Sequence, residues 1–401
     1  MRVVIDLQGC QSDGSRIRGI GRYSLALIKA MLKTGRQHEF ILLANANLVD
    51  LQPEFEPYFT DTSLRVHYCQ WLSPGPLAAR WPANQSRRML AQHLREFAIR
   101  RLRPDVIFIP SLFEGFGDEC VLSIDTAPGA APTAVIHYDL IPLIQAKTYL
   151  LPQPDYEDFY RKRLAELARA TQLLSISAYA AQEAIESLEL PADQITTISS
   201  ACDTELFCTA EADQLDTEPL PSGLTEGFIF YSGAGDPRKN LMRLIQAYAA
   251  LPAQIRGHHQ LALVGKLCEA EVMELKGLML DLCLEPGRVV LLGYVDDPTL
   301  ARLYRRCAVF IFPSLHEGFG LPALEAMSCG AAVIGSNRTS VPEVIGDPEA
   351  MFDPTDVVAM SSLLHRSLSD PAFHKRLLAN AQQRSRLFSW SSTAAKALTA
   401  M

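Results

Sequence analysis

The chain has 401 residues, of which 48% are hydrophobic and 20% are charged, and its formal net charge is −8. This length predicts two or three domains that each bury a core. The acidic balance argues against a nucleic-acid binder that neutralises phosphates. Nine scattered cysteines show no zinc-ligand spacing, and no apolar run approaches the roughly 20 residues of a membrane span. The first residues enter a strand without leader-peptide features, so we expect a cytoplasmic protein.

Short β-branched runs alternate with helical patterns along the whole chain. This alternation is typical of βαβ units and predicts an α/β protein with parallel sheets. The expected strands are Val3–Leu7, Phe40–Leu43, Val106–Ile109, Thr133–Ile136, Leu173–Ile176, Phe228–Tyr231, Gln260–Val264, Val289–Leu292, Val309–Phe312 and Ala332–Ile334. The expected helices include Tyr23–Leu32, Gln85–Arg101, Tyr156–Ala170, Leu241–Ala250 and Glu269–Cys283.

The alternation is interrupted at Glu211–Gly227, a polar stretch rich in proline and glycine. Such a composition predicts an interdomain linker. We therefore expect a first doubly wound domain at residues 1–208, a linker at 209–226, a second doubly wound domain at 227–385 and a helical tail at 386–401.

The first loop, Gln8–Tyr23, lies between the first strand and the first long helix. Ligands of open α/β sheets bind beyond the carboxyl ends of the strands, so this loop is a candidate ligand contact. Gly19 and Gly21 either allow close backbone approach to a ligand or form a tight turn. Three arginines are candidate contacts for an acidic acceptor or a diphosphate, with at least one expected to be solvated: Arg16, Arg18 and Arg22.

The segment Trp71–Arg103 combines aromatic side chains with arginines. Two interpretations remain open: the segment lies on an anionic membrane surface near a lipid-linked acceptor, or it forms a solvated helix face. The first interpretation places the protein at the inner face of a membrane. The arginines after the second tryptophan are Arg87, Arg88, Arg95, Arg100, Arg101 and Arg103.

A histidine and a tyrosine stand together where the fourth expected strand ends, in the string I-H-Y-D-L-I-P. Successive side chains of a strand point to opposite faces. His137 and Tyr138 therefore compete for one position, and either a bulge turns His137 toward the ligand or Tyr138 takes that place.

The second half of the chain opens with Y-S-G-A-G-D-P-R-K-N at residues 231–240. A strand, a glycine turn and a helix make the common anion-binding arrangement. Arg238 and Lys239 supply positive charge for a diphosphate, and Asn240 is expected to cap the next helix. The alternative interpretation is a capped helix with two exposed cations.

Residues 316–330, H-E-G-F-G-L-P-A-L-E-A-M-S-C-G, place Glu317 and Glu325 eight positions apart. Pro322 suits the first helical position and Gly330 suits the helix end, so we expect a loop, a tight turn and a helix of about two turns. The alternative is an ordinary turn with two solvated carboxylates. The N–H groups expected to form a diphosphate cradle at the positive end of the helix belong to Gly318, Phe319, Gly320 and Leu321.

This string resembles the signature of the retaining glycosyltransferases of family 4. That resemblance implies the GT-B fold, with two Rossmann-like domains facing across a cleft and a C-terminal helix returning to the first domain. It implies that Glu317 contacts the donor sugar and stabilises developing charge, and that Glu325 accepts hydrogen bonds from ribose. Arg238 and Lys239 would hold the diphosphate with the N–H groups of residues 318–321.

The resemblance is incomplete at two positions. Relatives often carry H-D-L-I-P, with the histidine beside the donor sugar and the scissile bond, whereas Tyr138 separates His137 from Asp139 here. Many relatives also carry an arginine where Ala234 stands. The cationic clamp would then rest on Lys239 with Arg238 or borrow an arginine of the first domain.

The activity implied by the resemblance is that of a metal-independent, retaining hexosyltransferase without a cofactor. The first loop and the string Y-D-L-I-P resemble bacterial mannosyl- and rhamnosyltransferases, which makes GDP-mannose the first expected donor. The acceptor would be a hydroxyl of a glycan or lipid-linked acceptor in the synthesis of surface polysaccharide such as the O-antigen of lipopolysaccharide. The Asp-x-Asp motif of metal-dependent transferases is absent from the sequence. Two alternatives are a catalytically silent GT-B domain that binds glycan or scaffolds an assembly, and a nucleotide-sugar epimerase or phosphorylase.

Overall fold

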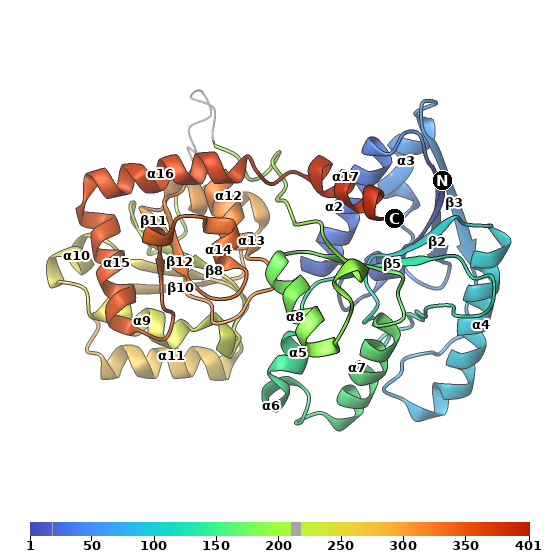
Figure 1. Cartoon of the computed structure of the whole chain (residues 1–401). Coiled ribbons are helices and arrows are strands. Elements are labelled where there is room, and N and C mark those ends of the chain that lie inside the picture. The colour runs from blue at the N-terminus through green and yellow to red at the C-terminus, as the bar shows by residue number, and fades with distance from the viewer. Residues whose placement is uncertain (18, 210–217) are drawn as a thin grey trace. The chain divides into compact units, whose positions relative to one another are not determined.

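The structure is a computed structural model that describes residues 1–17, 19–209 and 218–401. The chain divides into two compact units (Figure 1). The first unit comprises Met1–Ser200 and Trp390–Met401, and the second comprises Ala201–Ser389. Arg18 and residues 210–217 of the expected linker lie outside the described residues.

The first unit is built on a seven-stranded sheet with the order β3-β2-β1-β4-β5-β6-β7, in which neighbouring strands run parallel. Successive strands extend the sheet from β1 toward β3, and the chain then returns to the other side of β1 at β4. The carboxyl ends of β1 and β4 therefore form a topological switch point. The strands are β1 (Arg2–Asp6), β2 (Glu39–Asn45), β3 (Arg65–Trp71), β4 (Val106–Ile109), β5 (Thr133–His137), β6 (Gln172–Ser175) and β7 (Ile195–Thr197).

The second unit repeats this plan with a six-stranded parallel sheet of order β10-β9-β8-β11-β12-β13. Its switch point lies between β8 and β11. The strands are β8 (Ile229–Ser232), β9 (Leu261–Val264), β10 (Val289–Gly293), β11 (Val309–Phe312), β12 (Val333–Ser336) and β13 (Met351–Phe352).

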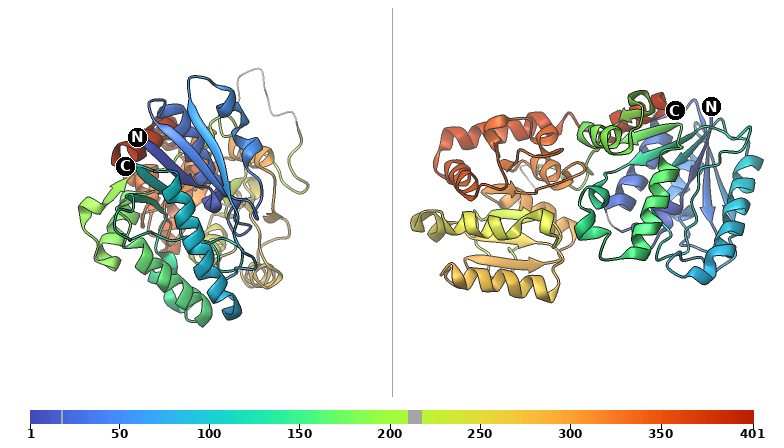
Figure 2. Two further views of the ribbon diagram at one scale, coloured as in Figure 1. Left: turned by 90° about the vertical axis from the view of Figure 1, so that its right-hand side faces the viewer. Right: turned by 60° about the horizontal axis from the view of Figure 1, so that its bottom comes forward.

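Helices connect the strands and cover the sheets in both units (Figure 2). In the first unit they are α1 (Gln8–Gln11), α2 (Gly19–Thr34), α3 (Gln52–Thr60), η1 (Pro82–Asn84), α4 (Gln85–Arg101), α5 (Ile141–Ile144), α6 (Ala146–Tyr149), α7 (Pro154–Leu167), α8 (Ala178–Leu188), η2 (Ala192–Gln194) and α17 (Trp390–Ala400). In the second they are η3 (Pro237–Lys239), α9 (Leu241–Ala249), α10 (Ala253–His258), α11 (Glu269–Asp281), α12 (Asp297–Arg306), α13 (Leu321–Ser328), α14 (Val341–Ile345), η4 (Pro348–Ala350), α15 (Val357–Ser369) and α16 (Pro371–Ser385).

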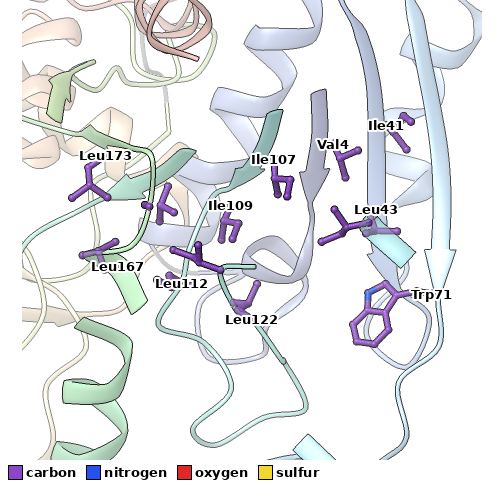
Figure 3. Close-up of a cluster of buried hydrophobic side chains, with 14 of the residues drawn as sticks. Val4, Ile41, Leu43, Trp71, Ile107, Ile109, Leu112, Leu122, Leu167 and Leu173 are labelled. Carbon is purple, nitrogen blue, oxygen red and sulfur yellow. The ribbon is translucent and has the colours of Figure 1, made fainter. Parts of the chain in front are cut away.

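The core of the first unit lies between the sheet and the helices α4 and α7. Buried branched side chains from β1, β4 and β6, including Val4, Ile107 and Leu173, pack together with Leu167 of α7 (Figure 3). Burial of such side chains contributes roughly 25 cal/mol per Å² of apolar area, so this layer stabilises the unit.

The last helix belongs to the first unit although the chain reaches it from the second. α17 packs against α2, and the rings of Trp390 and Tyr23 meet edge to face with centroids 5.1 Å apart. The Tyr23 hydroxyl donates to the carbonyl of Ser199 at 2.8 Å. The predicted doubly wound α/β architecture with a returning C-terminal helix is confirmed.

Candidate active site

The candidate site of the second unit lies where β8 and β11 end. The two loops that follow these strands, residues 233–236 and 313–320, flank the switch point. Open parallel sheets bind ligands at such a point because the adjacent loops diverge there. At Gly265, which follows the neighbouring strand β9, an added Cβ would lie 1.7 Å from the carbonyl oxygen of Gly233. Glycine is therefore required for the loops to approach this closely.

Glu317 is bound by two cations in this site. Nζ of Lys239 lies 2.5 Å from Oε1 of Glu317, and Nη1 of Arg238 lies 3.0 Å from Oε2. Arg238 also donates to the carbonyl of His316 at 3.2 Å. The hydroxyls of Ser340 and Thr339 fix the main chain of Glu317, at 2.8 Å from its carbonyl oxygen and 3.1 Å from its N–H.

This cluster is largely removed from solvent, since Glu317 is 7% exposed and Lys239 is 8% exposed. Burial alone would raise the pKa of the Glu317 carboxyl. The charges of Lys239 and Arg238 outweigh that effect and hold the pKa below its ordinary value. Glu317 is therefore a carboxylate at neutral pH. The alternative interpretation, a capped helix with two exposed cations, does not hold, because Lys239 is buried and the Arg238 side chain is only 21% exposed.

Glu325 lies one turn into α13 and takes part in a chain of hydroxyl groups. The Tyr304 hydroxyl of α12 is 3.0 Å from Oε2 of Glu325, and it is 2.6 Å from the Ser232 hydroxyl at the end of β8. Burial raises the pKa of Tyr304 well above its ordinary value, so the phenol remains protonated and can donate to the carboxylate. The chain orients Glu325 from the same switch point that holds Glu317.

The amino end of α13 adopts the expected loop–turn–helix form. Gly320 has φ +107°, in the left-handed region that favours glycine, and it precedes the helix. Pro322 occupies the second helical position rather than the predicted first, since α13 begins at Leu321. Gly330 follows the helix with φ +81°. The N–H groups of Gly320 and Leu321 lie at the end of the helix where no intrahelical acceptor exists.

Asn240 differs from its predicted role. It precedes α9 with φ 64° but makes no side-chain cap hydrogen bond. Its amide instead donates to the carbonyls of Pro313 and Pro354 at 3.1 and 2.7 Å. The residue thus ties the loop after β11 to the loop after β13, and it supports the segment that carries Glu317.

Gly19 and Gly21, the candidate ligand contacts of the first loop, lie in the first unit at the start of α2. An added Cβ at Gly21 would lie 2.4 Å from Cα of Arg16 and 2.4 Å from the carbonyl oxygen of Ser15, so Gly21 serves close packing within its own loop. Apart from its chain neighbours and the backbone of α2, no described residue has a heavy atom within 4 Å of a Cβ added at Gly19.

His137 ends β5 without a bulge, because its register with β6 continues unbroken to Ser175. Nδ1 of His137 is 2.8 Å from the Ser175 hydroxyl, and Nε2 is buried without a hydrogen-bond partner in the part of the chain that the structure describes. Burial lowers the pKa of His137 to about 4. Tyr138 points elsewhere: its hydroxyl contacts the Ser24 hydroxyl at 2.8 Å and the Pro110 carbonyl at 3.1 Å.

Two features of the sites were missed by the sequence reasoning. Tyr231 of β8 is fully buried, and its hydroxyl has no partner among the described residues. In the first unit, the loop after β4 repeats the pattern S-L-x-E-G-F-G of the loop after β11, so that Ser111–Gly117 corresponds to Ser314–Gly320. This internal repetition was the signal that identifies Glu114 as the counterpart of Glu317.

The surroundings of the two repeated glutamates differ. Oε2 and Oε1 of Glu114 accept hydrogen bonds from the hydroxyls of Ser12 and Ser111, each at 2.8 Å. The Ser12 hydroxyl also contacts Asp118. Burial raises the pKa of the Glu114 carboxyl, whereas Lys239 and Arg238 lower that of Glu317. Cations thus contact Glu317 of the loop after β11, whereas hydroxyl groups contact Glu114 of the loop after β4.

No group of three or more His, Cys, Asp or Glu side chains within residues 1–17, 19–209 and 218–401 is arranged to hold a metal ion. Over the same residues, the helices are too short or too polar to cross a bilayer.

A doubly wound pair of units, with a paired glutamate and cations at one switch point, is the architecture of GT-B glycosyltransferases. The family model of glycosyl transferases group 1 matches residues 214–384. The O-antigen chain mannosyltransferase B of Escherichia coli is 30% identical over 388 residues, covering 96% of this chain and 96% of that protein. The chain therefore belongs to the group 1 glycosyltransferases.

A second relative is longer than this chain. The serotype-specific mannosyltransferase WbdA of Escherichia coli is 36% identical over 400 residues, which cover 98% of this chain and 47% of that protein. The chain thus spans about half the length of this relative.

Solved structures agree with the fold. HepE of Anabaena, in complex with UDP and glucose, has a TM-score of 0.67 at 18% identity and full coverage of both chains. The sucrose-phosphate synthase of Thermosynechococcus elongatus has a TM-score of 0.69 at 21% identity, covering 98% of this chain and 96% of the other.

Proposed function

We propose that this chain transfers mannose from GDP-mannose to a hydroxyl of a growing bacterial surface glycan, with retention of anomeric configuration and without a metal. The observation that carries the proposal is the buried cluster of Glu317, Arg238 and Lys239 at the second switch point. The similarity to two mannosyltransferases of Escherichia coli, WbdA and the O-antigen enzyme, supports mannose as the sugar.

In this proposal the diphosphate takes over the cations that now contact Glu317. Arg238 and Lys239 bind the phosphate oxygens, together with the N–H groups of Gly318, Phe319, Gly320 and Leu321 at the positive end of α13. Charge develops on the diphosphate as the glycosidic bond breaks, and fixed cations in a buried site stabilise that charge most strongly. Glu325, held by Tyr304, accepts hydrogen bonds from the ribose hydroxyls.

The carboxylate of Glu317 faces the sugar and stabilises positive charge at the anomeric carbon. The acceptor hydroxyl attacks from the face that the diphosphate leaves, and the departing phosphate oxygen accepts its proton. His137 keeps a neutral imidazole at working pH because burial lowers its pKa. We assign it a hydrogen bond to the donor sugar through Nε2 rather than a charge-bearing role.

The first unit contributes the acceptor site in this proposal. Glu114 occupies the position of Glu317 in the repeated loop, but hydroxyl groups surround it instead of cations. Carboxylates that accept hydrogen bonds from hydroxyls are suited to a neutral, hydroxyl-rich ligand. We therefore assign Glu114 to the acceptor glycan. We further propose that the acceptor is a glycan or a lipid-linked glycan at the cytoplasmic side of a membrane.

A two-stage experiment tests the function. Thermal melting of the purified chain with GDP-mannose, UDP-glucose, dTDP-rhamnose and ADP-glucose identifies the donor, since a ligand at 100 times its Kd adds about 2.7 kcal/mol of stability. Transfer to octyl α-mannoside in the presence of EDTA, with NMR of the anomeric proton, then tests activity, metal independence and retention. Stabilisation by none of the four donors overturns the proposal. Stabilisation without transfer to any mannoside, glucoside or rhamnoside supports a silent glycan-binding domain instead.

A further inference from the structure

Helix α4 (Gln85–Arg101) departs from an ordinary surface helix, which buries apolar side chains and exposes polar ones. It buries an arginine, Arg95, between the apolar residues Ala91 and Ile99. Its inward face carries Arg95, which is 1% exposed and whose Nε lies 2.5 Å from Oδ2 of the buried Asp6. Arg88 also turns inward and donates to the Gly115 carbonyl at 3.0 Å. These contacts fix the rotation of the helix about its axis.

The outward face of α4 carries exposed apolar side chains among its polar ones. Leu90, Leu94 and Phe97 repeat at helical spacing on that face and are 53, 40 and 59% exposed. Met89 is 55% exposed, and Trp81, just before η1, is also 55% exposed. Contiguous exposed apolar side chains mark an interaction surface, whereas single ones need no explanation. We call Trp81, Met89, Leu90, Leu94 and Phe97 the α4 patch.

Positive charge borders the α4 patch. Arg80 lies over the Trp81 ring at 5.2 Å, and Arg101 lies over the Phe97 ring at 5.9 Å. Arg87 is exposed one turn before the patch residues, and none of the exposed residues of α4 is acidic. This local excess of positive charge occurs on a chain whose net charge is −8, so the charge of the patch is not an average property of the surface.

The neighbouring helix α7 limits the patch on one side. Between α4 and α7 lies a cavity of about 340 Å³ that is lined by Arg80, Trp81 and Lys162, among others. Lys162 is neutralised by Asp158 at 2.7 Å. Asp155 and Glu166 also line this cavity, and Glu166 is paired with Arg163. Among the described residues Arg80, Arg87 and Arg101 form no ion pair, so the uncompensated charge lies on α4 and its preceding loop.

We propose that the α4 patch docks the first unit onto an anionic lipid surface. Aromatic and aliphatic side chains enter the boundary between headgroups and acyl chains, while the bordering arginines contact lipid phosphates. Each arginine near such a surface contributes about 1 kcal/mol of attraction. Because the side chains of the α4 patch are already exposed, α4 does not have to rotate before the unit docks. This inference concerns a face of the first unit and does not depend on which donor or acceptor the second switch point selects.

Co-sedimentation of the whole chain with vesicles tests the proposal. Binding is expected to vesicles of phosphatidylglycerol with phosphatidylcholine, and binding to phosphatidylcholine alone should be at least ten-fold weaker. The double variant Leu90→Ser/Phe97→Ser removes apolar contacts, and Arg87→Gln/Arg101→Gln removes charge. Each should lower vesicle affinity at least ten-fold, and only wild-type and the apolar variant should keep a marked salt dependence.

A matched control is available on the second unit. Met273 and Leu280 of α11 are 73 and 76% exposed, so Met273→Ser/Leu280→Ser removes comparable apolar surface and should leave vesicle binding unchanged. All substituted side chains are exposed, and melting curves should confirm that the variants remain folded. Equal binding by wild-type and the α4 variants overturns the proposal. Loss of a concentration-dependent dimer in Leu90→Ser/Phe97→Ser, without vesicle binding by wild-type, would assign the face to a second copy of the chain instead.

Discussion

Lys239 and Glu317 form an ion pair, with Nζ of the lysine 2.5 Å from Oε1 of the glutamate. In the proposed reaction Lys239 binds the diphosphate of the donor and Glu317 faces its sugar. Arg238 contacts the second carboxylate oxygen at 3.0 Å. The anion that enters the site therefore competes with Glu317 for both cations. Donor binding and the position of the Glu317 carboxylate are coupled by this competition.

The substitution Glu317→Gln should separate donor binding from transfer. Removal of one negative charge leaves Arg238 and Lys239 available to a diphosphate, so calorimetric affinity for GDP should stay equal or increase. The rate of sugar transfer should fall by a factor of about 100 or more, because electrostatic stabilisation in the transition state is lost. A variant that transfers sugar at the wild-type rate would contradict the role of Glu317, and loss of GDP affinity would contradict the competition.

Lys239→Ala should weaken GDP binding. A hydrogen bond to a charged group contributes about 1.5–3 kcal/mol, which corresponds to a decrease in affinity of roughly 10- to 100-fold. Lys276→Ala is the control, because Lys276 is an exposed lysine of the same unit. Calorimetry with GDP should detect the difference between the two variants. Equal affinities would place the diphosphate clamp on other residues.

Most strands of the two sheets were predictable from the sequence, because buried parallel strands are continuous apolar runs. The expected strands Val106–Ile109 and Val309–Phe312 coincide with β4 and β11. The edge strand β3 was missed because its residues, R-V-H-Y-C-Q-W, are partly solvent-exposed and mixed in polarity. The strands β7 and β13 were missed because they have only three and two residues, too few to show a pattern.

The site was predictable only in part. Glycine and proline spacing is a local signal, so the turn before α13 could be inferred. The pairing of Glu317 with Lys239 joins positions 78 residues apart. Local motif spacing does not predict a contact between such distant positions. The predicted capping role of Asn240 was wrong for the same reason, since the carbonyls that accept its hydrogen bonds, those of Pro313 and Pro354, belong to loops distant in sequence.

Tyr304→Phe should test the hydroxyl chain that orients Glu325. The change removes the donor to Glu325 and the partner of the Ser232 hydroxyl, and an unsatisfied buried polar group costs about 1–3 kcal/mol. We expect a lower melting temperature and weaker binding of GDP, with a reduced preference for GDP over 2′-deoxy-GDP. Differential scanning calorimetry and competition binding measure these effects. An unchanged preference for the ribose hydroxyls would separate Tyr304 and Glu325 from ribose recognition.

Glu114→Gln should affect the acceptor and not the donor. The KM for octyl α-mannoside should rise about ten-fold, since a carboxylate accepts hydrogen bonds more strongly than an amide, while calorimetric affinity for GDP should be unchanged. Ser111→Ala removes one hydroxyl that now contacts Glu114 at 2.8 Å and should change the KM in the same direction. If wild-type binds donor but Glu114→Gln keeps the wild-type KM, the acceptor role of Glu114 is wrong and the transferase proposal stands.

His137 should make folding stability depend on pH in the acidic range. Burial lowers its pKa from the ordinary 6.5 to about 4, so the unfolded chain binds a proton at higher pH than the folded chain does. The stability that neutral His137 provides is fully present above pH 6.5 and is lost as the pH falls toward 4, by about 2 kcal/mol at pH 5. His137→Gln lacks this titration and retains a hydrogen-bonding group for the Ser175 hydroxyl. The difference in unfolding free energy between wild-type and His137→Gln, measured by urea titration at several pH values, should therefore decrease from pH 7 to pH 5. A constant difference would show that His137 is protonated in the folded chain or reached by solvent.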